Sequence, residues 1–376
     1  MNNKMWYTSP ASDWINGLPI GTGRLAGMVL GGIEEERIAL NHEWLNVGQN
    51  RDRTNEDRSE YLPKVRELLI EEKYEEATLL ANEAWGGSGG ISGRPTGEDS
   101  YQPAGDLRFS LDHGKVSNYR RELDLERARV KITYETEGKL ISRTVIGHLI
   151  EDCIIVRIYA NEETISGNFR LVREDDPRCD ILYDIGNATI IMHGAFHKGM
   201  KFCVKTDLKI REGKITAVGK NMLRVENAKE ILVFINIGTD AKGELPIEEC
   251  RRRSIPAKPW ERLYRENIAE HEKNYGRLNL TVNADEPNIP TDERIKAYKE
   301  GSNDVTLPLL YFNFGRYLLC ATSANGELPA NLQGKWNQDL MPAWDCDYHL
   351  DINLQMNYWP AESGHLQDYT NALFTY

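Results

Sequence analysis

The sequence lacks several patterns that would narrow its function at once. It has no run of eighteen apolar residues, so no membrane-spanning helix is expected. Its formal net charge of −12 disfavours nucleic acid and anionic membranes as partners, because both require basic patches. It has neither an internal repeat nor a low-complexity segment. With 40% hydrophobic and 28% charged residues, it is typical of a globular protein, and a prior of ~150 residues per domain suggests two or three domains.

The cysteines also form no pattern that indicates a function. The six cysteines form no CxxC pair, so neither a zinc site nor a disulfide framework is indicated, and reduced thiols in a cytoplasm are the simplest interpretation. The start, MNNKMWYTSPASDW, lacks the apolar run of a secretory signal. We therefore expect a cytoplasmic protein, or a secreted one if a leader has been lost, with no cofactor and no bound metal.

The first two thirds of the chain predict a β domain over residues 1–255. Short segments rich in Val, Ile, Tyr and Thr follow one another from residue 101 to about 237, separated by Gly, Asn and Asp. No helix of crossover length intervenes, which favours a large antiparallel sandwich over a parallel sheet. Residues 18–41 fit a strand, a turn and a strand. Residues 59–85 have apolar positions at helical spacing, and predict one or two surface helices inserted among the strands.

The character changes after residue 255. Residues 256–300 predict a helical linker, and residues 301–376 predict the beginning of a helical domain. The helix expected over 307–324 is hydrophobic nearly all round, so it should be buried on most sides. A second helix is expected over 353–364, ending near Pro360. Because two or three helices cannot bury their own faces, we expect an incomplete domain whose exposed apolar face favours aggregation or a partner.

Residues 328–366 combine aromatic rings with short carboxylates and amides. Flat aromatic faces stack on the apolar faces of sugars, while carboxylates and amides hold hydroxyls. The same mixture is costly in a plain core, because each buried polar group needs a partner. The segment therefore predicts a carbohydrate site. The expected substrate contacts are Trp336, Trp344, Asp345, Tyr348 and His349.

The sequence DYHLDIN within this segment indicates a possible catalytic group. If it is extended, residues two apart share a face, so His349, Asp351 and Asn353 would point into one cavity, whereas on a helix they would diverge by about 200°. We hypothesise that Asp351 and Asn353 position and activate a water molecule while His349 holds a substrate hydroxyl. A carboxylate can take the proton of the water, and an Asn carbonyl can orient it.

Structural alternatives stand beside this hypothesis. Asp351 or Asn353 could be the N-cap of the following helix, a role that both residue types favour. The aromatic residues could form a core, an interpretation favoured for Trp359 but not for Trp344, which lies among carboxylates. His42 is expected to be an ordinary surface or satisfied residue. The sequence GTGRLAG lacks the full pattern of a phosphate-binding loop.

Six blocks of sequence together are specific enough to indicate a family. They are LPIGTGRLAGMVLGGIEEERIALN, YQPAGDL, YRRELDLERA, IPTDERIKAYKEGSND, FGRYLLCATSANGELPANLQGKWNQ and DYHLDINLQMNYWPAE. With them the chain resembles the N-terminal portion of glycoside hydrolase family 95, the inverting α-L-fucosidases and their α-L-galactosidase relatives. The resemblance implies an α+β multidomain fold: an antiparallel β super-sandwich, a helical linker, an (α/α)6 barrel that holds the active site, and a small β domain.

The resemblance also implies roles for site residues. In the family, two asparagines of an HLNIN segment hold the attacking water, a downstream Asp completes the base, a downstream Glu is the general acid, and the His contacts the sugar. By position, the His and the two asparagines of that segment correspond to His349, Asp351 and Asn353. Asp351 stands where the best-known pattern has Asn, and a carboxylate there could act as the base directly. The family's acid and helper Asp lie beyond Tyr376.

The resemblance therefore implies hydrolysis, by inversion, of terminal α-L-fucosyl or α-L-galactosyl residues of oligosaccharides. The expected partners are a fucosylated glycan and, for an N-terminal fragment, the missing C-terminal half. Without the acid the isolated chain should be nearly inactive, because general acid catalysis contributes ~10²–10⁴-fold. Two alternatives stay open. A glycoside phosphorylase of related architecture should carry basic or Ser/Thr residues in place of Asp351 and Asn353, and a split gene could leave a noncatalytic carbohydrate-binding remnant.

Overall fold

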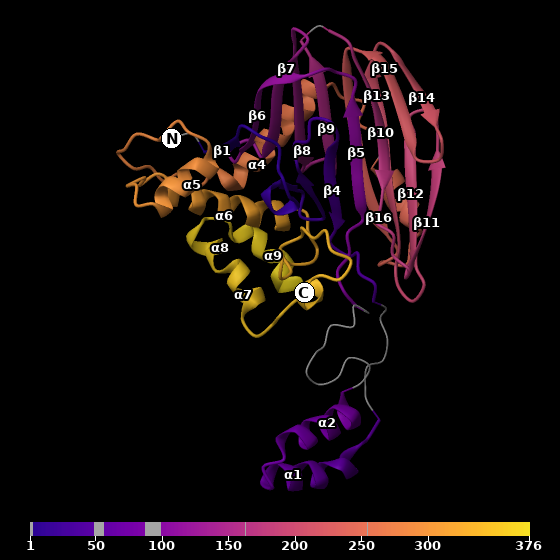
Figure 1. Ribbon diagram of the computed structural model, residues 1–376, viewed down its shortest axis with the longest axis vertical. Coiled ribbons are helices and arrows are strands. Elements are labelled where there is room, and N and C mark those ends of the chain that lie inside the picture. The colour runs from indigo at the N-terminus through magenta and orange to yellow at the C-terminus, as the bar shows by residue number, and fades with distance from the viewer. Residues whose placement is uncertain (1–2, 49–55, 87–98, 162, 254) are drawn as a thin grey trace.

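The computed structural model describes residues 3–48, 56–86, 99–161, 163–253 and 255–376. Two antiparallel sheets are stacked face to face, and the helices of the last third of the chain gather along one side and one end of them (Figure 1). None of the helices in these residues is long and apolar enough to cross a membrane. The six cysteines are all buried with free thiols.

The larger sheet has nine strands in the described residues. Its strands pair only in antiparallel fashion. In spatial order they are β1 Lys4–Tyr7, β6 Val116–Asp124, β7 Arg129–Thr136, β8 Lys139–His148, β9 Cys153–Ala160, β16 Glu230–Thr239, β13 Lys201–Arg211, β12 Thr189–Phe196 and β11 Cys179–Ile185.

The smaller sheet has seven strands in the same residues and is also antiparallel throughout. In spatial order they are β14 Lys214–Val218, β15 Met222–Ala228, β10 Ile165–Val172, β5 Gly105–Leu111, β4 Glu36–His42, β3 Leu25–Val29 and β2 Leu18–Gly21. Burial alternates strictly along β10 and β12, as period-two side-chain orientation requires when one face is covered.

The core between the two sheets is mostly aliphatic and aromatic. Phe109 and Phe169 lie opposite each other on β5 and β10, with ring centroids 5.3 Å apart. One buried ion pair joins the sheets, since Arg143 of β8 lies 3.1 Å from Glu36 of β4. Burial raises the pKa of Glu36, and the charge of Arg143 opposes that shift. The predicted large antiparallel sandwich is confirmed.

Three strands carry no sequence signal strong enough to predict them. β1 is short and lies at the edge of its sheet, β6 is rich in charged and polar residues, and β11 exposes every second residue. Each lies in the sheet because its neighbour offers a hydrogen-bonding partner, which is a tertiary effect. The edge strands β1 and β11 pair with one neighbour each, whereas β6 lies between β1 and β7.

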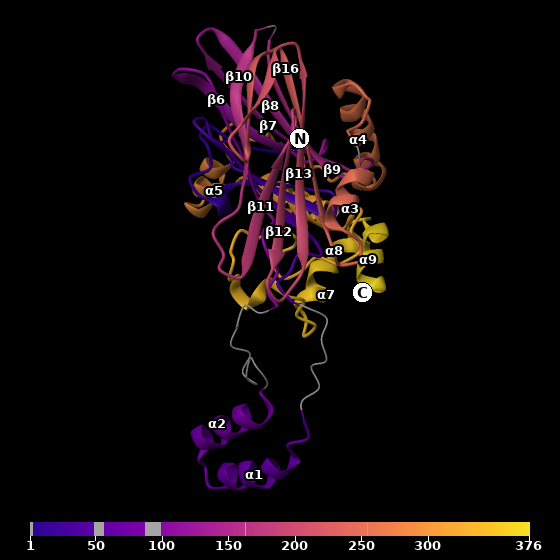
Figure 2. The ribbon, with the colours of Figure 1, turned by 90° about the vertical axis from the view of Figure 1, so that its right-hand side faces the viewer.

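The helices follow the strands of the sandwich in sequence, apart from one short helix and a helical insertion near the start. They are α1 Leu62–Ile70, α2 Tyr74–Trp85, α3 Pro246–Arg252, α4 Trp260–Tyr275, α5 Thr291–Lys299, α6 Leu307–Ser323, α7 Asn353–Tyr358, α8 Pro360–Ser363 and α9 Asn371–Thr375, with short 3-10 helices η1 Trp14–Asn16, η2 Ser59–Tyr61, η3 Ala343–Cys346 and η4 Gln367–Thr370. Helices α3 and α4 lie on the outer face of the larger sheet (Figure 2).

Helix α6 lies against the free edge of the smaller sheet, where β2 ends. The N–H of Gly23 donates to the carbonyl of Ala321 at 2.8 Å, and the hydroxyl of Tyr317 donates to the carbonyl of Pro19 at 2.8 Å. A Cβ at Gly21 would meet the Ala321 carbonyl oxygen at 2.3 Å. Glycine at this position is therefore what allows the helix to approach the strand so closely.

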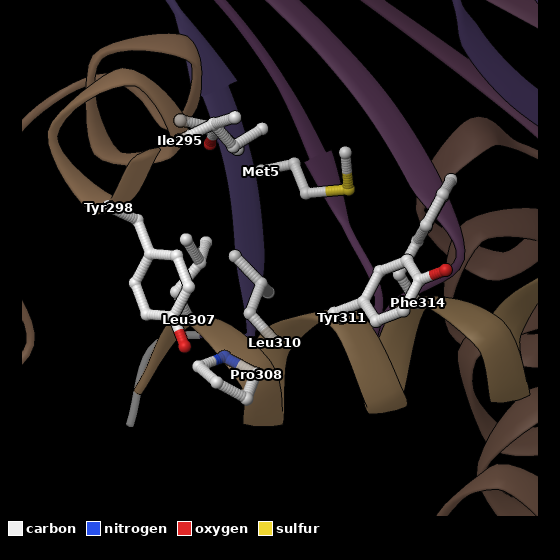
Figure 3. Close-up of a pocket in the computed structure, with 9 residues that line it drawn as sticks. Met5, Ile295, Tyr298, Leu307, Pro308, Leu310, Tyr311 and Phe314 are labelled. Carbon is white, nitrogen blue, oxygen red and sulfur yellow. The ribbon is translucent and has the colours of Figure 1, made fainter. Parts of the chain in front are cut away.

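The predicted burial of α6 holds on most of its sides, but one stripe is open. Tyr311 is 78% exposed, and together with Phe314 it borders two apolar hollows. One of them, of about 300 Å³, lies between α5, α6 and β1 (Figure 3). The side chains of Met5, Ile295, Tyr298 and Leu310 point into it from three elements. Its lining offers few groups that could hold a sugar hydroxyl.

The predicted helical insertion over residues 59–85 is present as a hairpin of α1 and α2. Val65 and Leu68 of α1 and Ala77 of α2 form a small core of their own, separate from the core of the sandwich. Figures 1 and 2 show the hairpin as a separate body at one end of the molecule. The limits of the three predicted domains, 1–255, 256–300 and 301–376, stay predictions.

Candidate active site

A buried ion pair anchors the segment that carries the predicted site residues. Glu43, directly after β4, accepts a hydrogen bond of 2.8 Å from Lys335, and both side chains are almost fully buried. The same carboxylate accepts from the backbone N–H groups of Glu327 and Leu328. Burial lowers the pKa of Lys335, and the adjacent Glu43 charge opposes that effect. The chain after α6 is thus fixed to the sandwich by one fully satisfied carboxylate.

A second set of contacts fixes the following turn. The hydroxyl of Tyr101 donates to the Lys335 carbonyl at 2.9 Å, and the N–H of Tyr101 donates to the Asp345 carbonyl at 2.9 Å. Asn337 is completely buried and donates to the Tyr101 carbonyl at 3.1 Å. Tyr101 therefore holds the site segment at Lys335, at Asn337 and at Asp345.

The turn itself has an unusual backbone. Trp344, Asp345 and Cys346 have φ values of 50°, 55° and 53°. Non-glycine residues in the left-handed region cost roughly 1–2 kcal/mol each, so a run of three persists only because the surrounding contacts hold it. Cys346 is buried with its thiol 3.2 Å from the Asn331 side-chain oxygen. In this conformation Trp344 is 68% exposed, as expected for a residue that stacks on a ligand.

Asp345 lies in the most acidic part of the turn. Partial burial raises the pKa of its carboxyl, and the negative charges of Asp347 and Asp99 raise it further. One of its carboxylate oxygens is buried and has no hydrogen-bond partner within the described residues. A carboxyl in this position holds a proton more readily than an ordinary Asp, and can therefore donate a hydrogen bond to a ligand.

The extended conformation predicted for DYHLDIN ends too early. Asp347 has an extended backbone, residues 348 and 349 belong to no helix or strand, residues 350–352 form a turn, and Asn353 is already the first residue of α7. Ile352 has a φ of 94°, and the N–H of Leu354 donates to the His349 carbonyl at 3.0 Å. The prediction that His349, Asp351 and Asn353 share one face of an extended segment is therefore wrong, because the chain reverses between the first and the last of them.

The alternative role of these residues as helix caps is also wrong. The residue that precedes α7 is Ile352, and no side chain caps the helix. Asp351 and Asn353 are both exposed, whereas His349 is half-buried and its Nε2 lies 3.4 Å from the Trp344 carbonyl oxygen. The structure thus leaves the side chains of Asp351 and Asn353 open at the start of α7, and places His349 against the strained turn.

The aromatic residues that are buried and those that are exposed differ from the prediction. Trp336 is 6% exposed, and its indole N–H points at the carbonyls of Ile20 and Gly27, at 3.1 and 3.2 Å. It packs the helical part onto the sandwich and does not lie with Trp344. Trp359, expected to be core, is 63% exposed, because α7 and α8 turn it away from the sandwich. Tyr348 is half-buried and lies against Tyr376, with ring centroids 4.8 Å apart.

The supporting residues were missed by the sequence reasoning. Glu43 and Tyr101 lie far from the site in sequence, and only the fold brings them to Lys335. One signal was present, since a lone Lys within NLQGKWNQ, among apolar and amide residues, requires a buried partner. His42, expected to be ordinary, is fully buried with its Nε2 3.6 Å from Glu249, and burial lowers its pKa.

Comparisons with known proteins agree with this arrangement. Residues 5–244 match the model described as glycosyl hydrolase family 65, N-terminal domain, and residues 259–376 match the glycosyl hydrolase family 95 catalytic domain. A sandwich of the first kind followed by helices of the second defines a glycoside hydrolase. Residues 259–376 match the family 95 catalytic domain, so the resemblance found in the sequence is confirmed.

The relatives are fucosidases by name. Alpha-L-fucosidase 2 of Arabidopsis thaliana is 30% identical over 99% of this chain and 48% of its own length. Probable alpha-fucosidase A of Aspergillus niger is 26% identical over 99% of this chain and 49% of its own length. The chain thus spans about half the length of these relatives. Among solved structures, a putative kojibiose phosphorylase from the human microbiome aligns with a TM-score of 0.47 at 8% identity, covering 89% of this chain and 45% of that one.

Proposed function

We propose that the protein acts as an α-L-fucosidase that releases terminal α-L-fucosyl or α-L-galactosyl residues from oligosaccharides by inversion. The observation that carries the proposal is the exposed HLDIN sequence at the start of α7, within the region that matches the family 95 catalytic domain. The names of the relatives support the substrate class. The ligand is a fucosylated glycan.

In the proposed mechanism Asp351 and Asn353 act on the attacking water. Both side chains are exposed near the start of α7. In this mechanism the side-chain carbonyl of Asn353 orients the water and Asp351 takes its proton. His349 holds a hydroxyl of the sugar, while Trp344 stacks on the ring. Inversion requires an acid across the bond, with carboxyls ~6.5–9.5 Å apart, and these residues supply the base side.

Fucose release from a terminal α-1,2-fucosyl trisaccharide tests the proposal when it is measured on a protein that carries the whole family 95 catalytic domain, because the residues of this chain supply the base side alone. In phosphate-free buffer the product should be free fucose, and NMR should detect the β-anomer first, as inversion of an α-glycoside requires. Fucose 1-phosphate formed only with added phosphate would indicate a phosphorylase. Glycan binding without any release would indicate a noncatalytic carbohydrate-binding protein, and neither binding nor release would contradict the whole proposal.

The role of Asp351 has a sharper test. If Asp351 is the base itself, Asp351→Asn should lower kcat by about 10²–10⁴-fold. If a second carboxylate supplies the base, the same substitution should leave kcat within a few-fold. Asp368→Asn is the matched control, because Asp368 is an exposed carboxylate whose partner is Arg277.

A further inference from the structure

A polar hollow lies beside the strained turn, on the side of the sandwich. Its volume is about 860 Å³, large enough for more than one sugar unit. Asp347 and Tyr376 line it from the helical part, and the ring of Tyr376 lies against Tyr348 of the candidate site. The hollow and the candidate site therefore share a wall. The other lining side chains used below are Trp44, Asn46, Asp99 and Asp240.

Three segments of the sandwich that lie outside its strands converge to form this hollow. A Cβ at Gly48 would meet a carboxylate oxygen of Asp99 at 2.5 Å, and a Cβ at Gly199 would meet the Val47 carbonyl oxygen at 1.8 Å. The contact with backbone requires glycine at position 199, whereas at position 48 the Asp99 side chain could move aside. These close approaches bring together the chain after β4, the chain before β5 and the turn between β12 and β13. The geometry is thus built into the backbone of the sandwich.

The side chains of the hollow are held in place by neighbouring groups. The indole N–H of Trp44 donates to Glu327 at 3.3 Å. A carboxylate oxygen of Asp240 accepts from the N–H of Lys201 at 2.9 Å, and one of Asp347 accepts from the N–H of Tyr348 at 2.7 Å. Preorganised side chains of this kind lose little entropy when a ligand binds.

The chemistry of the lining selects a neutral polyhydroxylated ligand. Trp44 and Tyr376 offer aromatic faces, and three carboxylates and one amide can accept hydrogen bonds from hydroxyls. No Lys, Arg or His is among the described residues that line it, which disfavours sulfated or carboxylated glycans. Nor do three acidic, His or Cys side chains of the described residues come close enough together to hold a metal ion.

We infer that this hollow binds the sugar units of the substrate that lie beyond the residue to be cleaved, with Trp44 as the stacking residue. The inference rests on the proposed function and deepens it, because it assigns part of the substrate site to the sandwich. On this inference a single sugar stays at the turn, and the further units of a longer ligand occupy the hollow. Specificity for the underlying glycan then depends on residues of the N-terminal domain.

Calorimetric titration of the full chain tests the inference with two probes, methyl α-L-fucoside and a neutral α-1,2-fucosyl trisaccharide. The wild type should bind the trisaccharide at least about fivefold more tightly, the size of one aromatic contact. Trp44→Ala should abolish this advantage while leaving the affinity for the fucoside unchanged. Trp44→Phe, which keeps an aromatic face, should retain most of it, and Tyr311→Ala in the apolar hollow should retain all of it.

The outcomes separate the inference from the proposed function. If Trp44→Ala keeps the advantage of the trisaccharide, or if the wild type shows none, the hollow is not a sugar site although fucoside recognition stands. If the wild type binds neither probe, both the inference and the recognition step of the proposed function are wrong. Trp44-dependent binding of spermine that disappears at high salt, without a preference for the trisaccharide, would assign the hollow to a cationic ligand instead.

Discussion

The sandwich and the helical part bury their apolar side chains in different ways. In the sandwich the two sheets cover each other, and a few isolated apolar residues such as Leu182 and Leu140 are exposed. In the helical part the large exposed apolar residues are close in sequence and include Trp344, Leu350, Ile352, Met356, Trp359, Phe374 and Tyr376. The sandwich therefore completes its own core, whereas the helical part depends on its contacts with the sandwich.

Lys335→Ala should lower the stability of the protein more than any other proposed substitution, because it breaks a contact between the helical part and the sandwich. Removing one member of a buried ion pair leaves an uncompensated charge at Glu43 and should lower the free energy of unfolding by about 3–5 kcal/mol. Hydrogen exchange should show faster exchange in α6 and α7 than in the strands. Urea denaturation measures the total loss.

The control for Lys335→Ala is Lys64→Ala in the insertion. Lys64 pairs with Glu67 at 2.9 Å, but both side chains are more than half exposed, so the loss should stay below about 1 kcal/mol. Similar losses for the two substitutions would contradict the assigned role of the Glu43–Lys335 pair.

A somewhat smaller effect concerns the contact between α4 and the sandwich. His271 is fully buried, and its Nε2 lies 2.9 Å from the Leu125 carbonyl oxygen. Burial lowers the pKa of His271 from 6.5 to about 4. Because this pKa is depressed on folding, the stability it contributes is present above pH 6.5 and is lost as the pH falls to about 4.

The size of that loss should be about 3 kcal/mol at the most, since one pKa unit corresponds to ~1.4 kcal/mol. Denaturation at several pH values should show it, and His271→Gln should flatten the profile in this window. His197→Gln, at an exposed position, should leave the profile unchanged. A wild-type stability that does not vary between pH 6.5 and 4 would contradict the prediction.

The next largest loss of stability is expected when the Trp336 indole, which joins the helical part to the sandwich, is replaced. Trp336→Phe keeps an aromatic group but replaces the indole with a smaller ring and removes the N–H that points at two carbonyls of the sandwich. The expected loss is about 1–2 kcal/mol, the cost of leaving buried acceptors without a donor. Trp359→Phe should change stability by less than about 0.5 kcal/mol because Trp359 is exposed. Equal losses of stability for the two substitutions would mean that the Trp336 indole N–H does not stabilise the contact between the helical part and the sandwich.

The smallest effect on stability should come from Tyr311→Ser. Tyr311 is mostly exposed between two apolar hollows, so its loss should change the free energy of unfolding by less than about 0.5 kcal/mol. It should instead reduce self-association of the chain, since exposed apolar patches favour it. Sedimentation at rising concentration measures this, and a wild type that stays monomeric would contradict it.

The sequence allowed the fold to be predicted wherever a periodic pattern was long. Most strands of the sandwich and helices α1, α2, α4 and α6 follow from alternation or from helical spacing. The strands β1, β6 and β11 did not, because they are polar or short and are held by a neighbouring strand. Which face of α6 stays open also depends on where β2 ends, and no local pattern encodes that.

The site could be predicted only in part. That residues 328–366 form a sugar site stays a prediction, and the exposure of Trp344 is as that prediction expects. The extended conformation failed at Ile352, whose positive φ is rare for a β-branched residue and has no sequence signal. The role of Trp336 and the anchor at Glu43 could not be predicted, because both depend on contacts across about three hundred residues.

The insertion that carries α1 and α2 leaves and rejoins the sandwich at a single point. The N–H of Val47 donates to the Ser100 carbonyl at 3.1 Å, and Asn46 pairs with Tyr101 as an isolated bridge. The two ends are thus already closed by the strands, and the stretch between them is exchangeable. It can be shortened, lengthened or replaced by another module without a change of register in the sheet. Since Tyr101 also holds the strained turn, such a replacement would bring a new module close to the candidate site.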